Sequence, residues 1–459
     1  MSARCHALRV FAPTLLVALS VGIAHGQDGG DGGGDGGGGD GDTAAGVSVS
    51  ADGLLVAIAT APGKPGLGKA AVADFLDDLD GDLNVATDAR KVSLTRLADF
   101  VAAGGEIDVV VRRLAGLNRV DRIVRSADGR DLILVGPAEP FAPDKDGRIF
   151  GALSGRPPLR LDDLTSLTAA LLDGERKIGC SLDPRPEGLV ALRRWLAGNS
   201  SPASTAVVMR RYRTMASVVG PHDATVRGVP HDSGSGARLL AADYVMKLIS
   251  LGLRPSGVRG VPSHLALLRP GGDAIQRWWF VPRYDAIERS RSGGVLSLRG
   301  PRLELLAEAE KADAAGNRSP VATKPASVAR FASAFSNHVD DLARVHASFA
   351  DLQNLIDLTV VAAVLCDGPA PLRDPEVAAR FADERVFPRG EVRVPRAAAT
   401  LANARQVSGR AVIGLVGGGV TIRPGRLLAS ATVDRVDDGA ERLRDDAAAP
   451  DGQTRWWWD

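Results

Sequence analysis

Several residue types are scarce in this chain, and each shortage excludes a class of protein. Its 459 residues include three cysteines and seven histidines, and only eight of the 56 basic residues are lysines. No Cys-x-x-Cys pair or Cys/His cluster occurs, so the sequence predicts no structural zinc site. The formal net charge of +1 offers no electrostatic basis for binding nucleic acid or an anionic membrane surface.

The remaining composition is that of a globular protein. Hydrophobic residues make up 45% of the chain and charged residues 24%, which excludes wholesale disorder, collagen and a polytopic membrane protein. A chain of this length predicts two or three domains. The order of turn residues and the spacing of apolar residues along the chain predict an α+β fold. This fold would have small antiparallel hairpins, mixed α/β segments and one long helical region.

The first residues have the pattern of a signal peptide. Arg4 and Arg9 precede an apolar run at 10–24, and small residues at −3 and −1 precede a predicted cut between Gly26 and Gln27. An uncleaved membrane anchor is the alternative, but the run is shorter than a bilayer requires. The sequence therefore predicts a secreted or periplasmic protein with no membrane span after cleavage.

A low-complexity tract follows the predicted cut. Residues 28–42 are ten glycines and five aspartates, which leaves no apolar side chain to bury and predicts a flexible linker. An exported chain would keep Cys180 and Cys366 in a compartment that permits disulfides. These two cysteines form either a disulfide or two buried thiols, and their spacing alone does not decide between the alternatives.

Turn residues divide the rest of the chain into short elements. Asp52-Gly53 and Asp128-Gly129 each separate two β-like runs and predict hairpins, and Ser93 is a good N-cap for a following helix. Gly417-Gly418-Gly419 is interpreted as a turn between strands. The predicted division is a signal peptide at 1–26, a Gly/Asp-rich disordered linker at 27–46, an α+β N-terminal domain with hairpins at 47–155, a mixed α/β domain at 156–300, a helical region at 301–370, a C-terminal β-rich segment at 371–433 and a disordered tail at 434–459.

The strongest helical signal lies in the predicted helical region. We expect a helix over 302–314, and the apolar spacing over 327–365 predicts further helices with one buried stripe. Asp243 and Lys247 lie four residues apart on another predicted helix and are expected to form a solvated ion pair. The residues of the stripe are Phe331, Phe335, Leu342, Phe349, Leu352 and Ile356.

Two motifs resemble ligand-binding loops but are incomplete. Residues 63–70 have the GxxxxGK frame of a phosphate-binding loop, but Ala70 stands where a Ser or Thr would hold Mg²⁺, so we expect no nucleotide. Asp78, Asp80 and Asp82 mimic the start of a calcium loop. That loop lacks its glycine and its closing glutamate, so a surface cluster is expected.

Two Pro-His-Asp tripeptides are the best candidates for a metal site. They place His222, Asp223, His231 and Asp232 on the two sides of a short strand, where two imidazoles and two carboxylates could meet at one transition metal. The alternative is that they are ordinary loop residues, because histidines near carboxylates are common without a metal.

The tail offers the best candidate for an interaction. Trp456, Trp457 and Trp458 follow a polar stretch, and three exposed tryptophans would be a costly apolar cluster. They could dock onto the protein's own surface or bind an unknown envelope protein or polymer. Both alternatives predict a role in association rather than in catalysis.

A series of short phrases resembles a known family over 90–365. They are Lys91-Val92-Ser93-Leu94, Ala115-Gly116-Leu117, Val135-Gly136-Pro137, Cys180-Ser181-Leu182-Asp183-Pro184, Pro186-Glu187-Gly188-Leu189, Gly228-Val229-Pro230, Ala241-Ala242-Asp243-Tyr244, Arg277-Trp278-Trp279 and Asn354-Leu355-Ile356-Asp357-Leu358. In this order they resemble secreted planctomycete proteins known as the domain of unknown function 1598 family. The resemblance implies no activity, cofactor or catalytic residue.

The sequence therefore favours a non-enzymatic protein that binds or scaffolds in the cell envelope, without a cofactor. No complete pair of nucleophile and base and no metal motif is present. The alternative is an extracellular metal-dependent enzyme that uses His222, Asp223, His231 and Asp232. Convergence of these four side chains on one point would favour the enzyme.

Overall fold

The computed structural model describes residues 47–49, 54–57, 81–144, 147–199, 201, 203–269, 275–312, 318–320, 325–390, 392, 394–407, 410–433, 440–450 and 452–459. Its helices and its antiparallel and mixed sheets confirm the α+β class. The predicted signal peptide and linker, the frame at 63–70, Asp78 and Asp80 lie outside the described residues.

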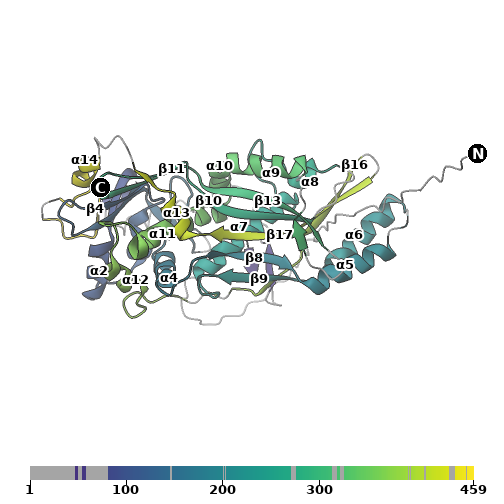
Figure 1. Ribbon diagram of the computed structural model, residues 1–459, viewed down its shortest axis with the longest axis horizontal. Coiled ribbons are helices and arrows are strands. Elements are labelled where there is room, and N and C mark those ends of the chain that lie inside the picture. Colours follow the sequence, from purple (N-terminus) through teal and green to yellow (C-terminus); the bar gives the residue numbers. More distant parts are fainter. Residues whose placement is uncertain are drawn as a thin grey trace, which may run out of the picture.

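The larger sheet has ten strands among the described residues and lies right of centre in Figure 1. The antiparallel pairing predicted for the runs on the two sides of Asp52-Gly53 is confirmed by β1 and β2, and the turn itself lies outside the described residues. The strands follow one another in space as β1 (Val47–Val49), β2 (Leu54–Ala57), β15 (Ala397–Ala398), β9 (His222–Arg227), β8 (Ile178–Pro184), β17 (Arg410–Ile422), β10 (Ile275–Arg283), β13 (Arg302–Ala312) and β14 (Arg318–Pro320), with β16 (Ala402–Val407) also paired to β17.

The helix predicted over 302–314 is wrong, because this segment contains strand β13. Its Ala, Glu, Leu and Lys residues favour a helix in isolation. In the protein, however, the segment pairs antiparallel with β10, and Leu303, Leu305 and Ala307 alternate into the core. Burial of one strand face thus outweighs the local helical preference.

The turn predicted at Gly417-Gly418-Gly419 is also wrong, because these residues lie inside strand β17. Gly418 has a φ of +127°, which L side chains rarely adopt. A Cβ atom there would lie 1.8 Å from the Trp278 carbonyl oxygen. The glycine allows β17 and β10 to approach this closely.

The smaller sheet has seven strands, which come from distant parts of the chain. Its β4 and β5 form the hairpin predicted at Asp128-Gly129. Each sheet combines strands from several of the predicted segments of the chain. The order is β18 (Thr432–Val433), β11 (Ala286–Arg289), β12 (Val295–Arg299), β4 (Arg122–Arg125), β5 (Leu132–Ala138), β3 (Thr87–Ser93) and β19 (Trp457–Trp458).

The disordered tail predicted over 434–459 is wrong for its described residues. Helix α14 (Ala440–Asp446) forms there, and β19 pairs antiparallel with β3. The polar composition predicted disorder, but the three tryptophans bury themselves at the edge of the smaller sheet. Local composition could not reveal that edge.

Helices cover the sheets, and β6 (Phe141–Pro143) and β7 (Ile149–Gly151) form a separate pair. Ser93 caps α2 as predicted, because its Oγ accepts the Arg96 N–H. The remaining helical elements are η1 (Gly81–Asn84), α2 (Leu94–Ala102), α3 (Val109–Arg112), η2 (Leu114–Gly116), α4 (Leu161–Leu172), α5 (Pro186–Gly198), α6 (Thr205–Val219), α7 (Gly234–Ser250), α8 (His264–Leu267), α9 (Ala326–Asn337), α10 (Val339–Val345), α11 (Ala347–Asp367), α12 (Pro375–Ala382) and α13 (Pro424–Ala429).

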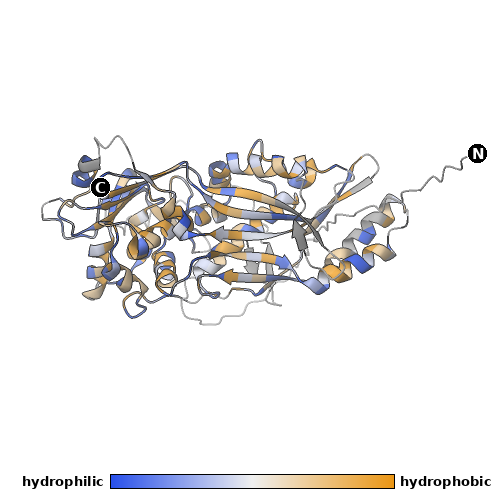
Figure 2. Cartoon of the chain, viewed as in Figure 1, coloured by the Kyte–Doolittle hydropathy of each residue, from blue (hydrophilic) through white to orange (hydrophobic). Residues whose placement is uncertain are grey.

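Helix α11 lies at the centre of the core. The predicted stripe residues on α9, α10 and α11 are all buried, as expected. Residues 348–366 of α11 are buried on every side, so this helix has no solvent face. It is long and apolar enough to cross a membrane, yet its apolar stretch is completely buried within the protein. Figure 2 shows hydrophobic residues along the central strands and on the helices beside them.

Candidate binding groove

The predicted metal candidates do not meet in the structure. His222 and Asp223 point to opposite faces of β9, with His222 buried and Asp223 exposed. Asp223 pairs with Arg185 at 2.6 Å, whereas Asp232 pairs with Arg396 at 3.3 Å. Within the described part of the chain, no three His, Cys, Asp or Glu side chains are grouped closely enough to hold a metal ion.

The predicted interaction residues are occupied by the chain itself. Trp456, Trp457 and Trp458 are each no more than 6% exposed. The fully buried Arg90 lies over the Trp457 ring and donates two hydrogen bonds of 2.8 Å to the Asp459 carboxylate. The structure thus shows the first of the two alternatives, docking within the protein.

The two cysteines of the described chain are free. Cys180 and Cys366 are both buried, and burial raises the pKa of each thiol above its usual value. The alternative of two buried thiols is therefore confirmed. Neither cysteine is a reactive thiolate at neutral pH.

A different feature emerges on the larger sheet, where α7 covers one face of β8 and β17. On the opposite face, one row of side chains crosses five strands. The strand registers place Leu306 beside Trp279, Trp279 beside Gly419, Gly419 beside Ser181, and Ser181 beside Thr225. The row therefore has an apolar end and a floor of small residues.

A hollow of about 580 Å³ lies at the apolar end of this row, and we call it the basic groove. The volume is within the range of small-molecule sites. Apolar side chains form its walls and three cations form its rim, with no carboxylate among them. The lining residues are Lys177, Trp279, Val281, Pro282, Leu306, Thr421, Arg423, Arg426 and Leu427.

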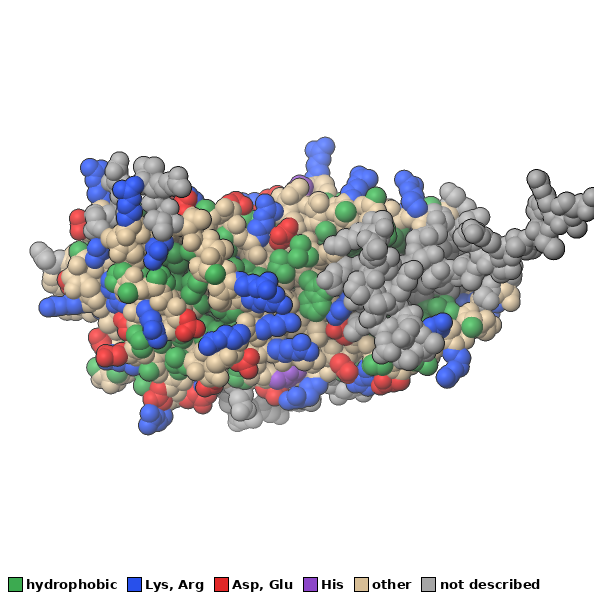
Figure 3. Space-filling model, viewed as in Figure 1, with side chains coloured by type: hydrophobic (Ala, Val, Ile, Leu, Met, Phe, Trp, Pro, Cys, Tyr) green, Lys and Arg blue, Asp and Glu red, His purple; other side chains and the backbone are tan. Residues whose placement is uncertain are grey.

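A much smaller hollow of about 20 Å³ adjoins the basic groove and shares Lys177, Trp279 and Thr421 with it. It adds a fourth cation, Arg227, and the Ser181 side chain. We call the two hollows together the trough. Figure 3 shows Lys and Arg side chains gathered beside hydrophobic side chains on this face.

The four cations of the trough are Lys177, Arg227, Arg423 and Arg426, and all are exposed. In the part of the chain that the structure describes, none of them forms an ion pair with a carboxylate. Strand directions explain their convergence. Lys177 precedes β8, Arg227 ends antiparallel β9, and Arg423 follows antiparallel β17, so these residues lie at one end of the sheet.

Trp279 is held in place from one side. The Arg277 guanidinium lies 4.7 Å from the centre of the indole ring and pairs with Asp183 at 3.1 Å. Arg277 lines neither hollow, so the indole meets the trough through its other face or its edge. This stacking fixes the ring orientation before any ligand arrives.

The ion pair predicted to be solvated is buried beneath the same strands. Lys247 and Asp243 are almost fully buried, and their charged groups are 2.6 Å apart. The Lys247 ammonium also donates to the Leu182 carbonyl at 2.9 Å and to the Gly418 carbonyl at 3.5 Å. Burial raises the pKa of Asp243 to about 6. The prediction was wrong because the helix is covered on all sides, which its sequence spacing does not reveal.

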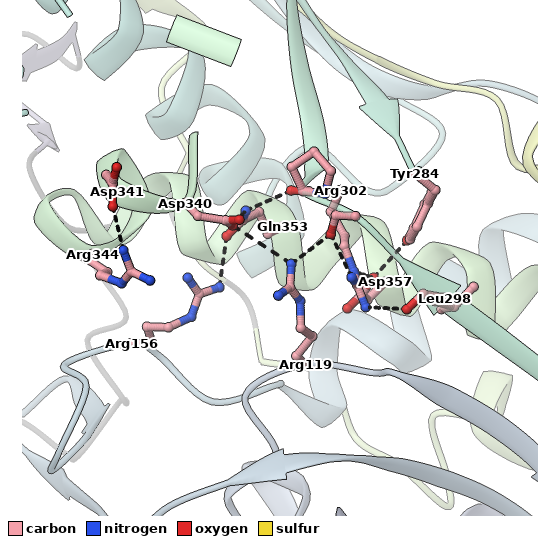
Figure 4. A network of polar contacts seen from close by, with 12 residues as sticks. Arg119, Arg156, Tyr284, Leu298, Arg302, Asp340, Asp341, Arg344, Gln353 and Asp357 are labelled. Carbon is pink, nitrogen blue, oxygen red and sulfur yellow. Dashed lines mark hydrogen bonds and ion pairs between the residues drawn. The ribbon is translucent and has the colours of Figure 1, made fainter. Parts of the chain in front are cut away.

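A second hollow of about 510 Å³ lies beside α9 and α10, but its carboxylates serve the fold. Asp340 accepts a hydrogen bond of 2.8 Å from Gln353 and lies 3.8 Å from Arg119. Asp341 pairs with Arg344. Figure 4 shows this network and its continuation along α11. Since these acids already have cationic or amide partners, the basic groove is the better candidate site.

Sequence analysis identified none of the groove residues as a site. The segment 278–282 is rich in aromatic residues that favour strands, and strand alternation could have placed Trp278 inside and Trp279 outside. No local pattern links Lys177 to Arg423, because more than two hundred residues separate them. Their proximity follows from the pairing of β8 with β17.

The chain is thus an α+β protein with an open, basic sheet face. Residues 180–264 match a family described as "Protein of unknown function (DUF1598)". The matched segment runs from β8 to the start of α8 and includes Arg227, Asp243 and Lys247. No curated protein and no solved structure matches the chain.

Proposed function

We propose that this chain is a secreted, non-enzymatic binding protein of the cell envelope, and that it holds an anionic ligand in the basic groove. One observation carries the proposal: cations that have no carboxylate partner among the described residues converge on a hollow with a half-buried indole and aliphatic walls. Such a hollow suits a ligand with both a negative group and an apolar or aromatic part.

The electrostatics support an anion. Four cations at one end of the sheet repel one another, and no acid is among the described residues that line the two hollows. A bound anion would remove the repulsion and gain charge-assisted hydrogen bonds from the arginines. The net charge of +1 hides this local excess, because acids elsewhere balance it.

A binding role is favoured over catalysis. Ser181 and Thr421 supply hydroxyl groups, but no histidine or carboxylate lines the described trough to act as their base. The metal-dependent alternative would need His222, Asp223, His231 and Asp232 together, and these side chains have separate surroundings. The apolar run near the N-terminus and the resemblance to secreted planctomycete proteins support export to the envelope.

The test uses an aromatic anion as probe. We expect anilinonaphthalene sulfonate to bind the folded protein with a rise in fluorescence. The variant Arg423→Glu/Arg426→Glu should bind it about tenfold more weakly, because two attractive charges become repulsive.

Arg193→Glu/Arg194→Glu is the matched control, because it reverses two exposed charges on helix α5, away from the groove lining. This variant should bind the probe like the wild-type protein. Equal binding by the groove variant and the wild-type protein would contradict the proposal.

A further inference from the structure

The trough is elongated, and this limits the shape of its ligand. Its two hollows meet at Lys177, Trp279 and Thr421 and continue one another along the sheet. The floor between Trp279 and Thr225 consists of Gly419 and Ser181, which leave the surface low. The adjoining hollow of about 20 Å³ has room for about one water molecule, so a ligand that reaches from the basic groove to Arg227 must lie along the surface as an extended chain.

The cations repeat across neighbouring strands. Arg227 belongs to β9, Lys177 precedes β8 and Arg423 follows β17, and these three strands are adjacent. Adjacent strands lie about 4.8 Å apart, so positive groups recur at short, similar intervals. Repeated charges are matched best by a ligand that also carries repeated charges of opposite sign.

The uncharged groups of the trough match a sugar ring. Trp279, Val281 and Leu306 offer a planar and an aliphatic surface to the C–H face of a pyranose. Ser181 and Thr421 offer hydroxyl groups that can both donate and accept hydrogen bonds with sugar hydroxyls. This mixture of apolar plane, hydroxyl and cation distinguishes the trough from a purely ionic site.

An extended acidic peptide fits less well. Peptides that bind sheets gain their affinity from hydrogen bonds along a free strand edge. Strands β8, β17 and β10 are each paired on both sides, so their backbone offers no such edge.

We infer that the ligand of the trough is a linear acidic polysaccharide, with one ring against Trp279 and its anionic groups at Lys177, Arg227, Arg423 and Arg426. The inference rests on the proposed function, because it names the ligand class of the same site. Trp279 supplies specificity for sugar, and the four cations supply affinity for its charge.

The test compares two polyanions on the full-length protein by isothermal titration calorimetry. Polygalacturonate carries carboxylates on pyranose rings, whereas polyglutamate carries carboxylates without rings. We expect polygalacturonate to bind about tenfold more tightly at equal carboxylate concentration, and more weakly as salt rises.

Two variants assign that preference to residues. Trp279→Leu keeps an apolar side chain but removes the planar ring, so it should abolish the preference for polygalacturonate. Arg423→Glu/Arg426→Glu should weaken binding of both polymers, and Arg193→Glu/Arg194→Glu should weaken neither. Circular dichroism establishes that each variant is folded.

The unfavourable outcomes are distinguishable. Equal binding of both polymers, unchanged in Trp279→Leu, would overturn the polysaccharide and identify a general polyanion site. Binding to phosphatidylglycerol vesicles in place of either polymer would overturn it in favour of a lipid surface. If the aromatic sulfonate binds the groove and no polymer does, the polysaccharide inference fails alone. If the sulfonate also fails to bind there, the proposed function fails with it.

Discussion

The arginines at the centre of the molecule and those of the basic groove have opposite surroundings. Arg302 is 2% exposed, and its Nε donates to Asp357 at 2.9 Å. Its remaining N–H groups reach the Val120, Gly300 and Leu298 carbonyls and Asp121. In the groove, Arg423 is exposed and has no carboxylate partner among the described residues.

This difference distinguishes buried arginines that stabilise the fold from exposed arginines that remain available to bind a ligand. Asp357 accepts hydrogen bonds from Arg302, Tyr284 and the Val120 backbone, so it joins α11 to β13 and to the segments that precede β4 and follow β10. The pairing is costly to break because a buried charge without its partner is strongly destabilising. An exposed cation loses almost nothing without a partner, so it can exchange water for a ligand.

The largest loss of stability should follow from removing the tail that pairs with the buried Arg90. Deleting residues 455–459 takes away Trp456, Trp457 and Trp458 together with the Asp459 carboxylate. We expect a loss of about 5 kcal/mol or more in unfolding free energy, because a large apolar area is lost and Arg90 stays buried without its acid. Urea denaturation measures this loss.

Trp457→Phe is a milder companion should the truncated chain not fold. It keeps an aromatic ring against Arg90 and should lose less stability than the deletion. An unchanged unfolding midpoint after deletion of 455–459 would show that the tail does not dock within the protein.

The next largest loss of unfolding free energy should follow from Asp357→Asn. This change removes one charge of the buried pair and leaves the buried Arg302 guanidinium with only the exposed Asp121 carboxylate as an acidic partner, so we expect a loss of about 3 kcal/mol in unfolding free energy. The double variant Arg302→Met/Asp357→Leu should recover part of that loss, because no buried charge remains. A single variant as stable as the wild-type protein would refute the role of this pair, again measured by urea denaturation.

A smaller loss of folding stability should occur at acidic pH. Burial lowers the pKa of His264 and His346 to about 4, below the usual 6.5. The unfolded chain therefore binds more protons than the folded protein between pH 6.5 and 4, and stability should fall as the pH decreases through this range. Protonation of Asp243, whose pKa is raised to about 6, acts in the opposite direction.

His264→Phe isolates one contribution to this acid sensitivity. The new ring keeps the aromatic contacts with Trp278 and Phe331, and it has no proton to gain. Between pH 7 and 4 the variant should lose about 2–3 kcal/mol less than the wild-type protein, as measured by unfolding at a series of pH values. Parallel stability curves would show that His264 does not titrate differently in the two states.

The smallest change in unfolding free energy should follow from substitutions in the basic groove. Arg423→Ala/Arg426→Ala should change the unfolding free energy by no more than about 0.5 kcal/mol, because both side chains are exposed and lack acidic partners. A loss of several kcal/mol in thermal or urea unfolding would mean that these arginines support the fold, and the contrast with Arg302 would disappear.

The α+β class and many of the local elements follow from short-range patterns in the sequence. The Asp-Gly hairpins, the Ser93 cap and the apolar spacing from Phe331 to Ile356 all depend on residues a few positions apart. Such signals lie within a single turn, helix or strand, so they can be recognised from the local sequence alone.

Which residues become buried, and which cations converge, depends on the tertiary structure. Residues 302–312 became a strand because β10 lies beside them, and Lys247 became buried because β8 and β17 cover its helix. The Trp tail found an edge on β3, more than three hundred residues earlier in the chain. The groove cations likewise converge through strand pairing rather than through proximity in sequence. Burial and charge convergence depend on neighbours that chain folding selects, and no local pattern of residues encodes them.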